Sequence, residues 1–335
     1  MKKALKIILR IFLVCFTAGV FGVSFIFGVL NRIHYGPSET ARNIFVSTVM
    51  ETFNGRFLAR WFHSDEEIEA ITQGIGRIDF TPDEEIEEEN PPSSEVITVI
   101  PVEKKLDIEL VNISGPTYNG KMLIVADPSR VSVVTSIPFQ ENGRGMKLKE
   151  LAEVSNSVAA INGGAFADNG GDMPLGVVIS NGELLHCNNA TREYSIVGFN
   201  YENKLITDKM TAAEAIENGL RDAISFSPIL IKDGKPTNVS GYSLGLNPRT
   251  AIGQRADGAV LLLVIDGRQP QSLGATYQDL IDIMVDYGAV NACTLDGGSS
   301  SLMVYEGEVI TKCCSLYGPG RIPTCFAVAE VLTDE

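Results

Sequence analysis

The stretch TYQDLIDIMVDYGAVNACTLDGGSSS (276–301) predicts a helix, a strand and a polar loop in direct succession. Apolar residues at helical spacing, ended by a glycine that is typical of a helix C-terminus, are Leu280, Ile283, Met284, Tyr287 and Gly288. The apolar run Ala289 to Leu295 then predicts a strand. The strand is followed by the loop Asp296-Gly297-Gly298-Ser299. Because glycine has no Cβ, an anion or a sugar can approach the backbone N–H groups of this loop closely. The same residues are also typical of an ordinary tight turn.

The residues from Val96 onward predict a strand-rich domain. Short β-branched runs are joined at four dipeptides typical of hairpin turns, Asn181-Gly182, Asp233-Gly234, Asp257-Gly258 and Glu306-Gly307. The apolar run Val260 to Ile265 is expected to be a strand covered on both faces. Two further helices are predicted, at about Leu148 to Asn156 and after the capping box Thr211 to Glu214. The fold class is therefore α+β, with a mixed or antiparallel sheet and a few packed helices over residues 96–335.

The N-terminus predicts a membrane anchor. Residues 11–30 carry no charge and are long enough to cross a hydrocarbon core of ~30 Å. A cleaved signal peptide would have a shorter apolar region and a small-residue cleavage site. Four basic residues precede the span, so the tail 1–10 is expected to stay in the cytoplasm. The rest of the chain would then be extracellular, in a single-pass protein of the cell membrane.

Residues 31–95 are predicted to be a helical and acidic linker. One helix face is expected from the apolar residues that recur at every fourth position, although Asn54-Gly55 weakens its middle: Phe45, Val49, Phe53, Phe57 and Trp61. The segment Glu84 to Pro92 is typical of a solvated, self-repelling tether. Most of the net charge of −15 comes from this acidic region. Because no basic stripe is present to neutralise phosphates, nucleic acid is not an expected partner.

Cysteine and histidine usage limits the chemistry. Cys15 lies in the predicted anchor. The other five cysteines do not have CxxC spacing, and they are compatible with one or two disulfides. They are Cys187, Cys293, Cys313, Cys314 and Cys325. The chain has three histidines, His34, His63 and His186. A histidine-rich metal site is therefore excluded, and a Ser-His-Asp triad would have to use His186.

Four polar, glycine-containing clusters follow apolar strands, at residues 162–168, 247–253, 266–268 and 295–301. Together they supply two arginines, Arg249 and Arg268, whose planar forks match phosphate oxygens. They also supply a carboxylate pair, Asp266 and Asp296, of the kind that glycoside cleavage commonly uses. Each cluster alone is more typical of a turn or a surface ion pair, but their combination fits recognition of a phosphate-bearing substrate.

These clusters resemble the phosphodiester glycosidase domain family. The similarity runs in order from about Leu106 to the C-terminus, through INGGAFAD (161–168), PLGVVISNGELL (174–185), SFSPILIKDGK (225–235), NPRTAIG (247–253), VIDGR (264–268), the opening stretch (276–301) and RIPTCFAVAE (321–330). Members of the family usually have NGGFFD and DGGGS, whereas this chain has Ala165 and Ser299 at the variant positions.

The resemblance implies an extracellular hydrolase that cleaves glycosyl phosphodiesters of wall or capsule polymers. We expect Asp296 and Asp266 to be catalytic. The expected substrate-binding residues are Asn162, Asp168, Arg249, Thr250, Arg268, Gly297, Gly298 and Ser299. No cofactor is expected. Two alternatives stay open: a non-catalytic module that binds anionic wall glycans, and a metal-dependent phosphodiesterase with a divalent cation on Asp168, Asp266 and Asp296.

Overall fold

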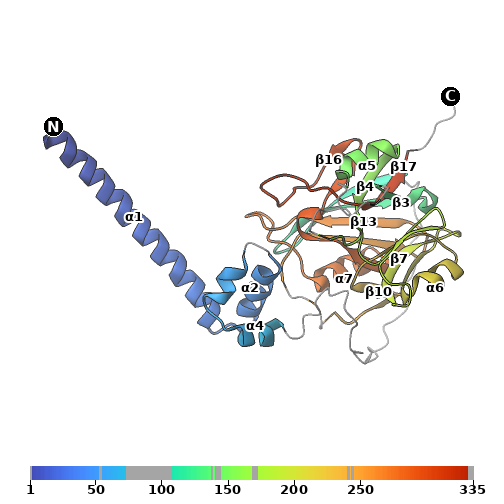
Figure 1. Ribbon diagram of the computed structural model, residues 1–335, viewed down its shortest axis with the longest axis horizontal. Helices are drawn as coiled ribbons and strands as arrows, with labels where there is room; N and C mark the ends of the chain where they lie inside the picture. Colours follow the sequence, from blue (N-terminus) through green and yellow to red (C-terminus); the bar gives the residue numbers. More distant parts are fainter. Residues whose placement is uncertain are drawn as a thin grey trace. The chain divides into compact units, whose positions relative to one another are not determined.

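The computed structural model describes residues 2–52, 55–72, 107–136, 139, 145–167, 173–239, 242 and 245–330 (Figure 1). These residues belong to two compact units, whose described parts are residues 2–72 and residues 107–330. The predicted acidic tether, Glu84 to Pro92, lies outside the described residues.

The first unit consists of helices. They are α1 (Lys2–Tyr35), α2 (Glu39–Glu51), α3 (Arg56–Arg60) and α4 (Asp65–Thr72). The Leu9–Tyr35 part of α1 is long and apolar enough to cross a membrane, with a mean hydropathy of 2.3. It contains the predicted anchor, residues 11–30, and continues five residues further to Tyr35. By length and composition, this helix is a candidate membrane span.

The prediction that the apolar residues from Phe45 to Trp61 lie on one face of a single helix is wrong. Helix α2 ends at Glu51, and α3 starts only at Arg56, after Gly55. Val49 is buried, with Val46, in a small apolar cluster shared by α2, α3 and α4, whereas Trp61 is 69% exposed. Thr52 is the C-cap of α2 and Gly55 is the N-cap of α3, a position that suits glycine better than a helix interior does.

The second unit contains three antiparallel sheets. The seven-stranded sheet has the order β1 (Ile108–Ser114), β2 (Asn119–Val125), β13 (Val260–Ile265), β12 (Arg249–Arg255), β14 (Ala289–Leu295), β10 (Ile229–Lys232) and β11 (Lys235–Pro236). One five-stranded sheet has the order β16 (Glu308–Val309), β15 (Met303–Tyr305), β4 (Ser157–Asn162), β17 (Thr324–Ala329) and β3 (Val131–Thr135). The other has the order β6 (Glu183–Cys187), β5 (Val177–Ser180), β9 (Leu220–Ser225), β7 (Tyr194–Asn200) and β8 (Leu205–Met210).

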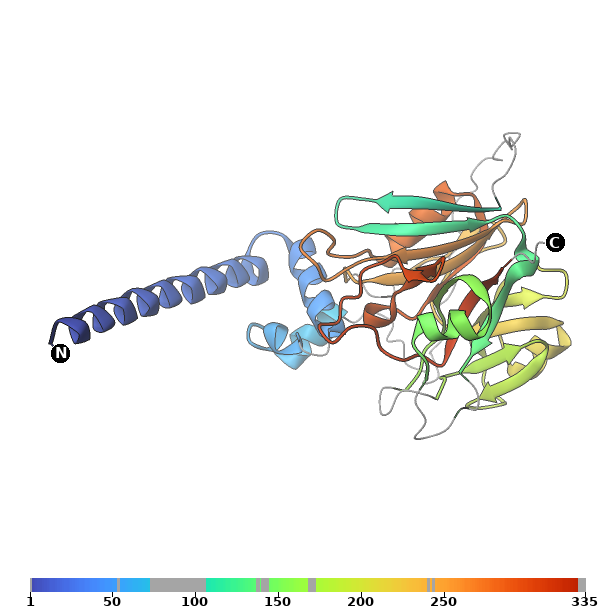
Figure 2. The same ribbon diagram turned by 90° about the horizontal axis from the view of Figure 1, so that it is seen from above.

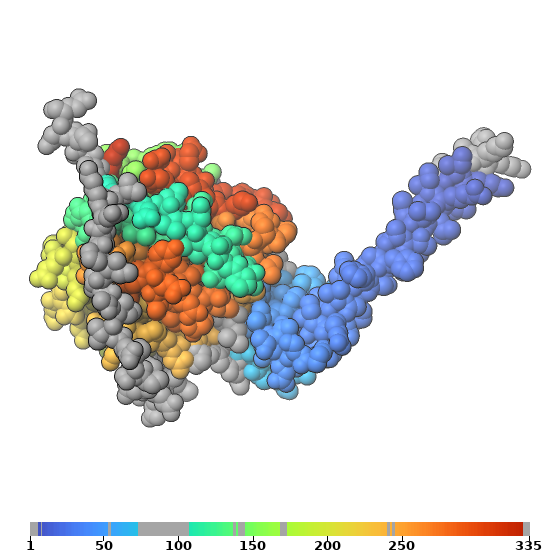
Figure 3. All heavy atoms as spheres, turned by 180° about the vertical axis from the view of Figure 1, so that it is seen from behind, coloured from blue at the N-terminus to red at the C-terminus, as the bar shows by residue number. Residues whose placement is uncertain are grey.

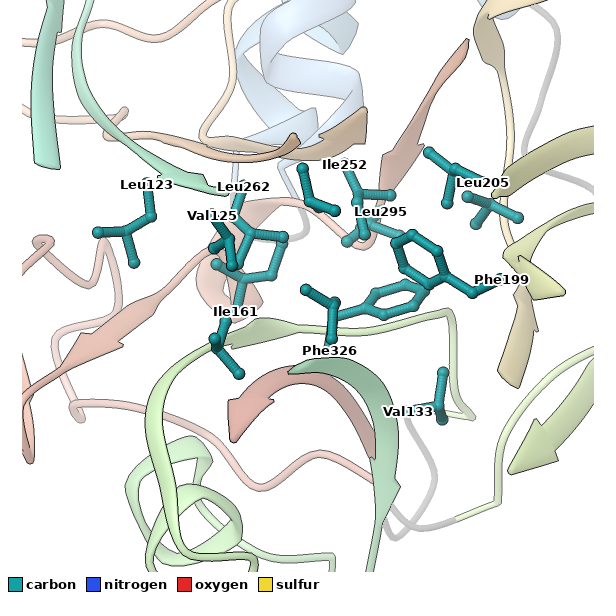
Figure 4. Packing of buried hydrophobic residues seen from close by; sticks show 14 of the residues in the cluster. Leu123, Val125, Val133, Ile161, Phe199, Leu205, Ile252, Leu262, Leu295 and Phe326 are labelled. Atoms are coloured by element: carbon teal, nitrogen blue, oxygen red, sulfur yellow. The ribbon is translucent and has the colours of Figure 1, made fainter. Parts of the chain in front are cut away.

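The three sheets share one apolar core (Figure 4). Leu262 and Leu295 enter it from the seven-stranded sheet, Ile161 and Phe326 from the second sheet, and Phe199 from the third. The rings of Phe199 and Phe326 meet edge to face, with centroids 6.3 Å apart. Since side chains alternate along a strand, each sheet keeps a second face that must be covered separately.

One helix covers the outer face of each sheet. Helix α7 (Tyr277–Asp286) packs on the seven-stranded sheet, α5 (Leu148–Val154) on the sheet of β4 and β17, and α6 (Ala212–Glu217) on the sheet of β7 and β9. Figure 2 shows the β1–β2 hairpin (teal) beside the orange strands of the first sheet, and Figure 3 shows its teal atoms next to the orange segment. Strand β13 therefore contributes alternate residues to two cores, and every residue of β13 is buried.

The predicted fold class is confirmed as α+β with antiparallel sheets. All four hairpin dipeptides lie at turns, and their glycines have φ angles between +75° and +91°. The predicted capping boxes of α6 and α7 also form, with Thr211 and Thr276 as N-caps. All six cysteines are free, so none of the disulfides compatible with the sequence is present.

Candidate functional site

Three of the four predicted clusters meet around the backbone of Pro248. A Cβ on Gly267 would lie 2.5 Å from the Pro248 nitrogen, and one on Gly297 would lie 3.0 Å from the Pro248 oxygen. The Gly298 N–H donates to that same oxygen at 3.0 Å. Glycine is therefore required at Gly267 because the two backbones are in close contact. The clusters at 247–253, 266–268 and 295–301 form one assembly.

Asn162 joins the first cluster to the others. Its side-chain Nδ2 donates to the Asp296 carbonyl at 2.6 Å, and its Oδ1 accepts from the Thr250 hydroxyl at 2.7 Å. The same Oδ1 accepts from the Leu302 N–H at 3.2 Å. Asn162 and Thr250 are completely buried. Both side chains thus support the loop after β14 from behind, rather than forming the surface that meets a sugar.

Arg268 lies at the exposed side of this assembly. Its Nε and one terminal nitrogen both donate to Asn247 Oδ1, at 3.3 and 2.9 Å. Its other terminal nitrogen is 3.5 Å from the position that a Cβ on Gly298 would take. Arg268 has a φ of +55°, a left-handed conformation that costs a non-glycine residue about 1–2 kcal/mol. Strain of this kind is frequent at functional sites.

Arg249 approaches the same place from inside the protein. It is 6% exposed, and its guanidinium lies over the Tyr277 ring at 3.9 Å. It donates to the carbonyls of Ala275 and Gly245, at 3.3 and 3.1 Å. Ala275 in turn pairs with Asn247 through two backbone hydrogen bonds. The Asn247–Ala275 bridge therefore connects both predicted phosphate ligands, although they lie at different depths.

Asp266 is a half-buried carboxyl at the end of β13. Burial raises the pKa of Asp266, and this effect outweighs the Lys312 backbone N–H, which donates to Oδ1 at 2.9 Å. The protonated form of Asp266 is consequently favoured to a higher pH than in an exposed aspartate. A carboxyl that keeps its proton to a higher pH is better suited to proton donation than an exposed aspartate.

The loop after Asp296 presents backbone donors. The N–H groups of Gly297 and Ser299 donate to no acceptor within the described ranges, whereas the Gly298 N–H is used by Pro248. Gly298 has a φ of +64°, while Ser299 lies in a short 3-10 turn, Gly298–Ser300, without a left-handed φ. The serine that replaces the family's usual third glycine thus needs no special backbone conformation.

A segment that the sequence did not point to closes this arrangement. Beyond the Lys312 bond to Asp266, the Cys313 thiol donates to the Ser299 carbonyl at 3.6 Å, and Cys314 interacts with Arg268. This segment, Lys312 to Ser315, is called the cysteine segment below. It lies 44 residues or more beyond Arg268 along the chain, so no local pattern linked it to the site. Asn247 was also missed, although it belongs to the quoted motif NPRTAIG.

Asp168, the remaining predicted ligand, lies outside the described residues. Within the described ranges, no three His, Cys, Asp or Glu side chains are grouped in a way that could hold a metal ion. The metal-dependent alternative also required Asp168, so it stays a separate hypothesis.

Replacing Gly298 with alanine should lower the free energy of unfolding by about 1 kcal/mol, because the new Cβ is strained at positive φ. Gly234→Ala is the matched control, since Gly234 has a φ of +78° in the β10–β11 turn with open space around it. Thermal unfolding should show similar losses in both variants. Binding of an anionic substrate should weaken only in Gly298→Ala, where the Cβ stands beside Arg268; equal binding in both would contradict the assignment of this loop.

Comparison with known proteins identifies relatives of the second unit. The profile of the family described as phosphodiester glycosidase matches residues 155–329, just over half of the chain. The curated N-acetylglucosamine-1-phosphodiester alpha-N-acetylglucosaminidase of Bos taurus is 26% identical over 184 residues, which are 50% of this chain and 34% of the relative. The uncharacterized SPbeta prophage-derived protein YomE of Bacillus subtilis is 31% identical over 177 residues, 48% of this chain and 26% of the relative.

A solved structure shares the fold. The zebrafish N-acetylglucosamine-1-phosphodiester alpha-N-acetylglucosaminidase catalytic domain, auto-inhibited by its pro-peptide, aligns with a TM-score of 0.58 and 24% identity, over 67% of this chain and 82% of that domain. A hypothetical protein from Synechocystis aligns with a TM-score of 0.51 and 17% identity, over 66% of this chain and 61% of the other. The sequence matches to the two curated relatives span about a third or less of their own lengths.

Proposed function

The chain belongs to the phosphodiester glycosidase family, and from this premise we propose that it hydrolyses the bond between the anomeric carbon of a sugar and the phosphodiester oxygen attached to it. The observation that carries the proposal is that one loop assembly holds an exposed arginine, a carboxyl of raised pKa, and two backbone N–H groups without an acceptor among the described residues. Anion-binding donors and a proton donor are the two requirements of this reaction.

The phosphate is proposed to bind Arg268 and the N–H groups of Gly297 and Ser299. A guanidinium and backbone donors stabilise the charge that develops on the leaving phosphate as the carbon–oxygen bond breaks. Arg249 lies deeper, so its proposed contribution is positive charge and support of the Asn247–Ala275 bridge. Asp168 is proposed to bind sugar hydroxyls, as the sequence predicted.

The two aspartates are proposed to divide the chemistry. Asp266, whose pKa is raised by burial, donates its proton to the leaving phosphate oxygen. Asp296 is proposed to face the anomeric carbon. The distance between the two carboxyl groups decides whether Asp296 attacks that carbon as a nucleophile or acts as a base on a water molecule. Overall, water supplies a hydroxyl to the sugar and a proton to the phosphate, which leaves as a monoester. Asn162 and Thr250 are proposed as positioning residues that hold the Asp296 loop.

The proposed reaction can be tested by finding which bond breaks. The full chain in detergent is incubated with UDP-GlcNAc, or another GlcNAc-1-phosphodiester, in water enriched in heavy oxygen. Label in the released sugar supports carbon–oxygen cleavage and the proposal. Label in the phosphate instead supports the phosphodiesterase alternative, especially if a chelator abolishes turnover. Saturable glycan binding without any turnover supports the binding-module alternative.

Replacing Arg268 with lysine should lower kcat/KM by about tenfold, because an ammonium cannot bond Asn247 through two nitrogens and face the phosphate with a third. The effect should appear mainly as a higher KM for the phosphodiester. Arg255→Lys is the control. Arg255 pairs with Asp257 and lies at the end of β12 that is farther from the candidate site, whereas Arg249 begins the strand. Equal kinetics for Arg268→Lys and the unchanged chain would remove Arg268 from the phosphate site.

We further propose that residues 11–30, within the apolar helix Leu9–Tyr35, anchor the protein in the cell membrane, with residues 1–10 cytoplasmic and the second unit extracellular. The apolar helix and the preceding basic residues support this orientation. Residues 31–95 would then act as the linker and residues 96–335 as the catalytic domain. Under this arrangement, the substrates are glycans outside the cell that carry sugars in phosphodiester linkage.

A further inference from the structure

The cysteine segment contains two neighbouring thiols inside the candidate site. Cys313 and Cys314 are consecutive residues and are both half-buried. Burial, and to a smaller extent the charge of Cys313, raises the pKa of Cys314. Two other thiols of the same unit differ from this pair in their burial. Cys293 and Cys325 are completely buried, and burial raises the pKa of Cys325 to about 12. Because the side chains of Cys293 and Cys325 are completely enclosed, an external disulfide cannot reach these two thiols.

The pair is bonded to the residues that the proposed reaction uses. Cys313 donates its S–H to the Ser299 carbonyl and accepts the Ser315 N–H at 3.4 Å. Cys314 interacts with Arg268, and the preceding residue, Lys312, holds Asp266 through its backbone N–H. A change at the two sulfur atoms would therefore act on the anion-binding loop, the arginine and the acid together.

The chain next to the pair is open to solvent. Leu316 and Tyr317 are each 99% exposed at the tip of this loop. Cys313 and Cys314 are only half-buried themselves, so a small oxidant can reach the thiols. Cys313 also packs against the apolar cluster that contains Leu302 and Val304, so a change at its sulfur is passed to the strand that follows the loop 295–301.

We propose that Cys313 and Cys314 form a redox-sensitive dithiol, which an external low-molecular-weight disulfide converts to a vicinal disulfide that disables the site. The proposal rests on the proposed function. Cys313, whose Sγ accepts the Ser315 N–H, loses its proton and attacks one sulfur of the external disulfide, and the other sulfur leaves and takes up that proton. Cys314 then loses its proton and attacks Cys313 Sγ, which releases the second external thiol. Two protein thiols are oxidised, and one external disulfide is reduced to two thiols.

Closing this ring removes the S–H that donates to Ser299. The two sulfur atoms must also turn toward one another, which withdraws Cys314 from Arg268 and changes the backbone at Lys312. Asp266 then loses its N–H donor. The site remains present in the oxidised chain, but its acid, its arginine and its loop are no longer held by the same segment.

The test compares the full chain in detergent after treatment with oxidised glutathione or with dithiothreitol. Trypsin cleaves after Lys312 and Arg321, so both thiols lie in one peptide, residues 313–321, without any other cysteine. We expect this peptide to lose two hydrogen atoms in mass on oxidation. We also expect faster hydrogen exchange at the Lys312 amide and turnover about tenfold lower, equivalent to losing one positioned hydrogen bond. Dithiothreitol should reverse all three changes.

The double variant Cys313→Ser/Cys314→Ser should show no difference between the two treatments. Cys187→Ser is the matched control, because Cys187 is a half-buried thiol on β6, and its response to oxidation should equal that of the unchanged chain. Peptide 313–321 that keeps both thiols overturns the proposal. The proposal is also overturned if the disulfide forms but the hydrogen-exchange rate of the Lys312 amide does not change. If the reduced chain cleaves no glycosyl phosphodiester, the proposed function fails, and the peptide mass and amide exchange still decide the dithiol.

Discussion

Replacing Asp266 with asparagine should lower kcat by about a thousandfold, the contribution expected of a general acid. Asparagine keeps the size of the side chain and an oxygen for the Lys312 N–H, so the chain should fold normally. It cannot deliver a proton to the leaving phosphate. The measurement is steady-state hydrolysis of a GlcNAc-1-phosphodiester, with thermal unfolding to confirm the fold.

The sequence contains a close control for this variant. Asp257-Gly258 repeats the dipeptide Asp266-Gly267 at the other end of β13, and Asp257 also accepts a backbone N–H, from Ala259 at 3.1 Å. Asp257→Asn should leave kcat within about twofold, as expected for a surface substitution away from the site. Comparable losses in the two variants would indicate that the β13 turns matter for folding and that Asp266 is not the acid.

The pH dependence provides a second measurement on Asp266. Burial raises the pKa of this carboxyl, so its proton is retained as the pH rises above the normal range for aspartate. Turnover that requires the protonated form is complete below the raised pKa and is lost as the pH rises through it. We expect this alkaline decline in kcat for the unchanged chain, and its absence from the residual activity of Asp266→Asn.

Replacing Asn162 with alanine should lower the free energy of unfolding by about 3 kcal/mol, because three buried polar groups lose their partner. They are the Thr250 hydroxyl, the Asp296 carbonyl and the Leu302 N–H. Denaturant unfolding measures the loss. Asn112→Ala is the control, since Asn112 is exposed on β1, and its cost should stay within about 0.5 kcal/mol.

A second substitution at this position separates packing from hydrogen bonding. Asn162→Asp keeps the acceptor for Thr250 and Leu302 but faces the Asp296 carbonyl with an oxygen. The pKa of the introduced carboxyl should be raised in the folded state by burial and by that carbonyl, since its protonated form can donate where Nδ2 did. Stability is therefore retained below the unfolded pKa of about 3.9 and lost as the pH rises through the folded pKa. A variant with pH-independent stability would contradict the proposed role of Asn162.

Local patterns predicted the elements well. The run Val260 to Ile265 is apolar throughout because its side chains point alternately into two apolar cores. Such a run indicates a buried strand even when its neighbouring strands are unknown. Hairpin dipeptides and capping boxes were equally reliable, since their hydrogen bonds join residues close in sequence. The same reasoning failed between Phe45 and Trp61, where periodic apolar residues continued although α2 ends at Glu51 and α3 begins after its N-cap, Gly55.

The candidate site was predictable in its membership more than in its geometry. Polar clusters at strand ends indicated residues that would meet, and hydrogen bonds and close contacts now connect the clusters at Asn162, Asn247–Pro248, Asp266–Arg268 and Asp296–Ser299. Sequence did not separate Arg249, which is buried on Tyr277, from Arg268, which lies at the exposed side. The pairing of β12 with β13 and β14 decides that depth.

The loop 295–301 shows both contributions. Its own residues predicted a glycine-rich turn after a buried strand, because the end of a strand and the conformation of a glycine depend mainly on residues close in sequence. Tertiary structure decided which amides remain open, since Pro248 takes the Gly298 N–H and leaves those of Gly297 and Ser299. It also brought in the cysteine segment, whose contacts with Asp266, Arg268 and Ser299 depend on chain packing across long sequence separations.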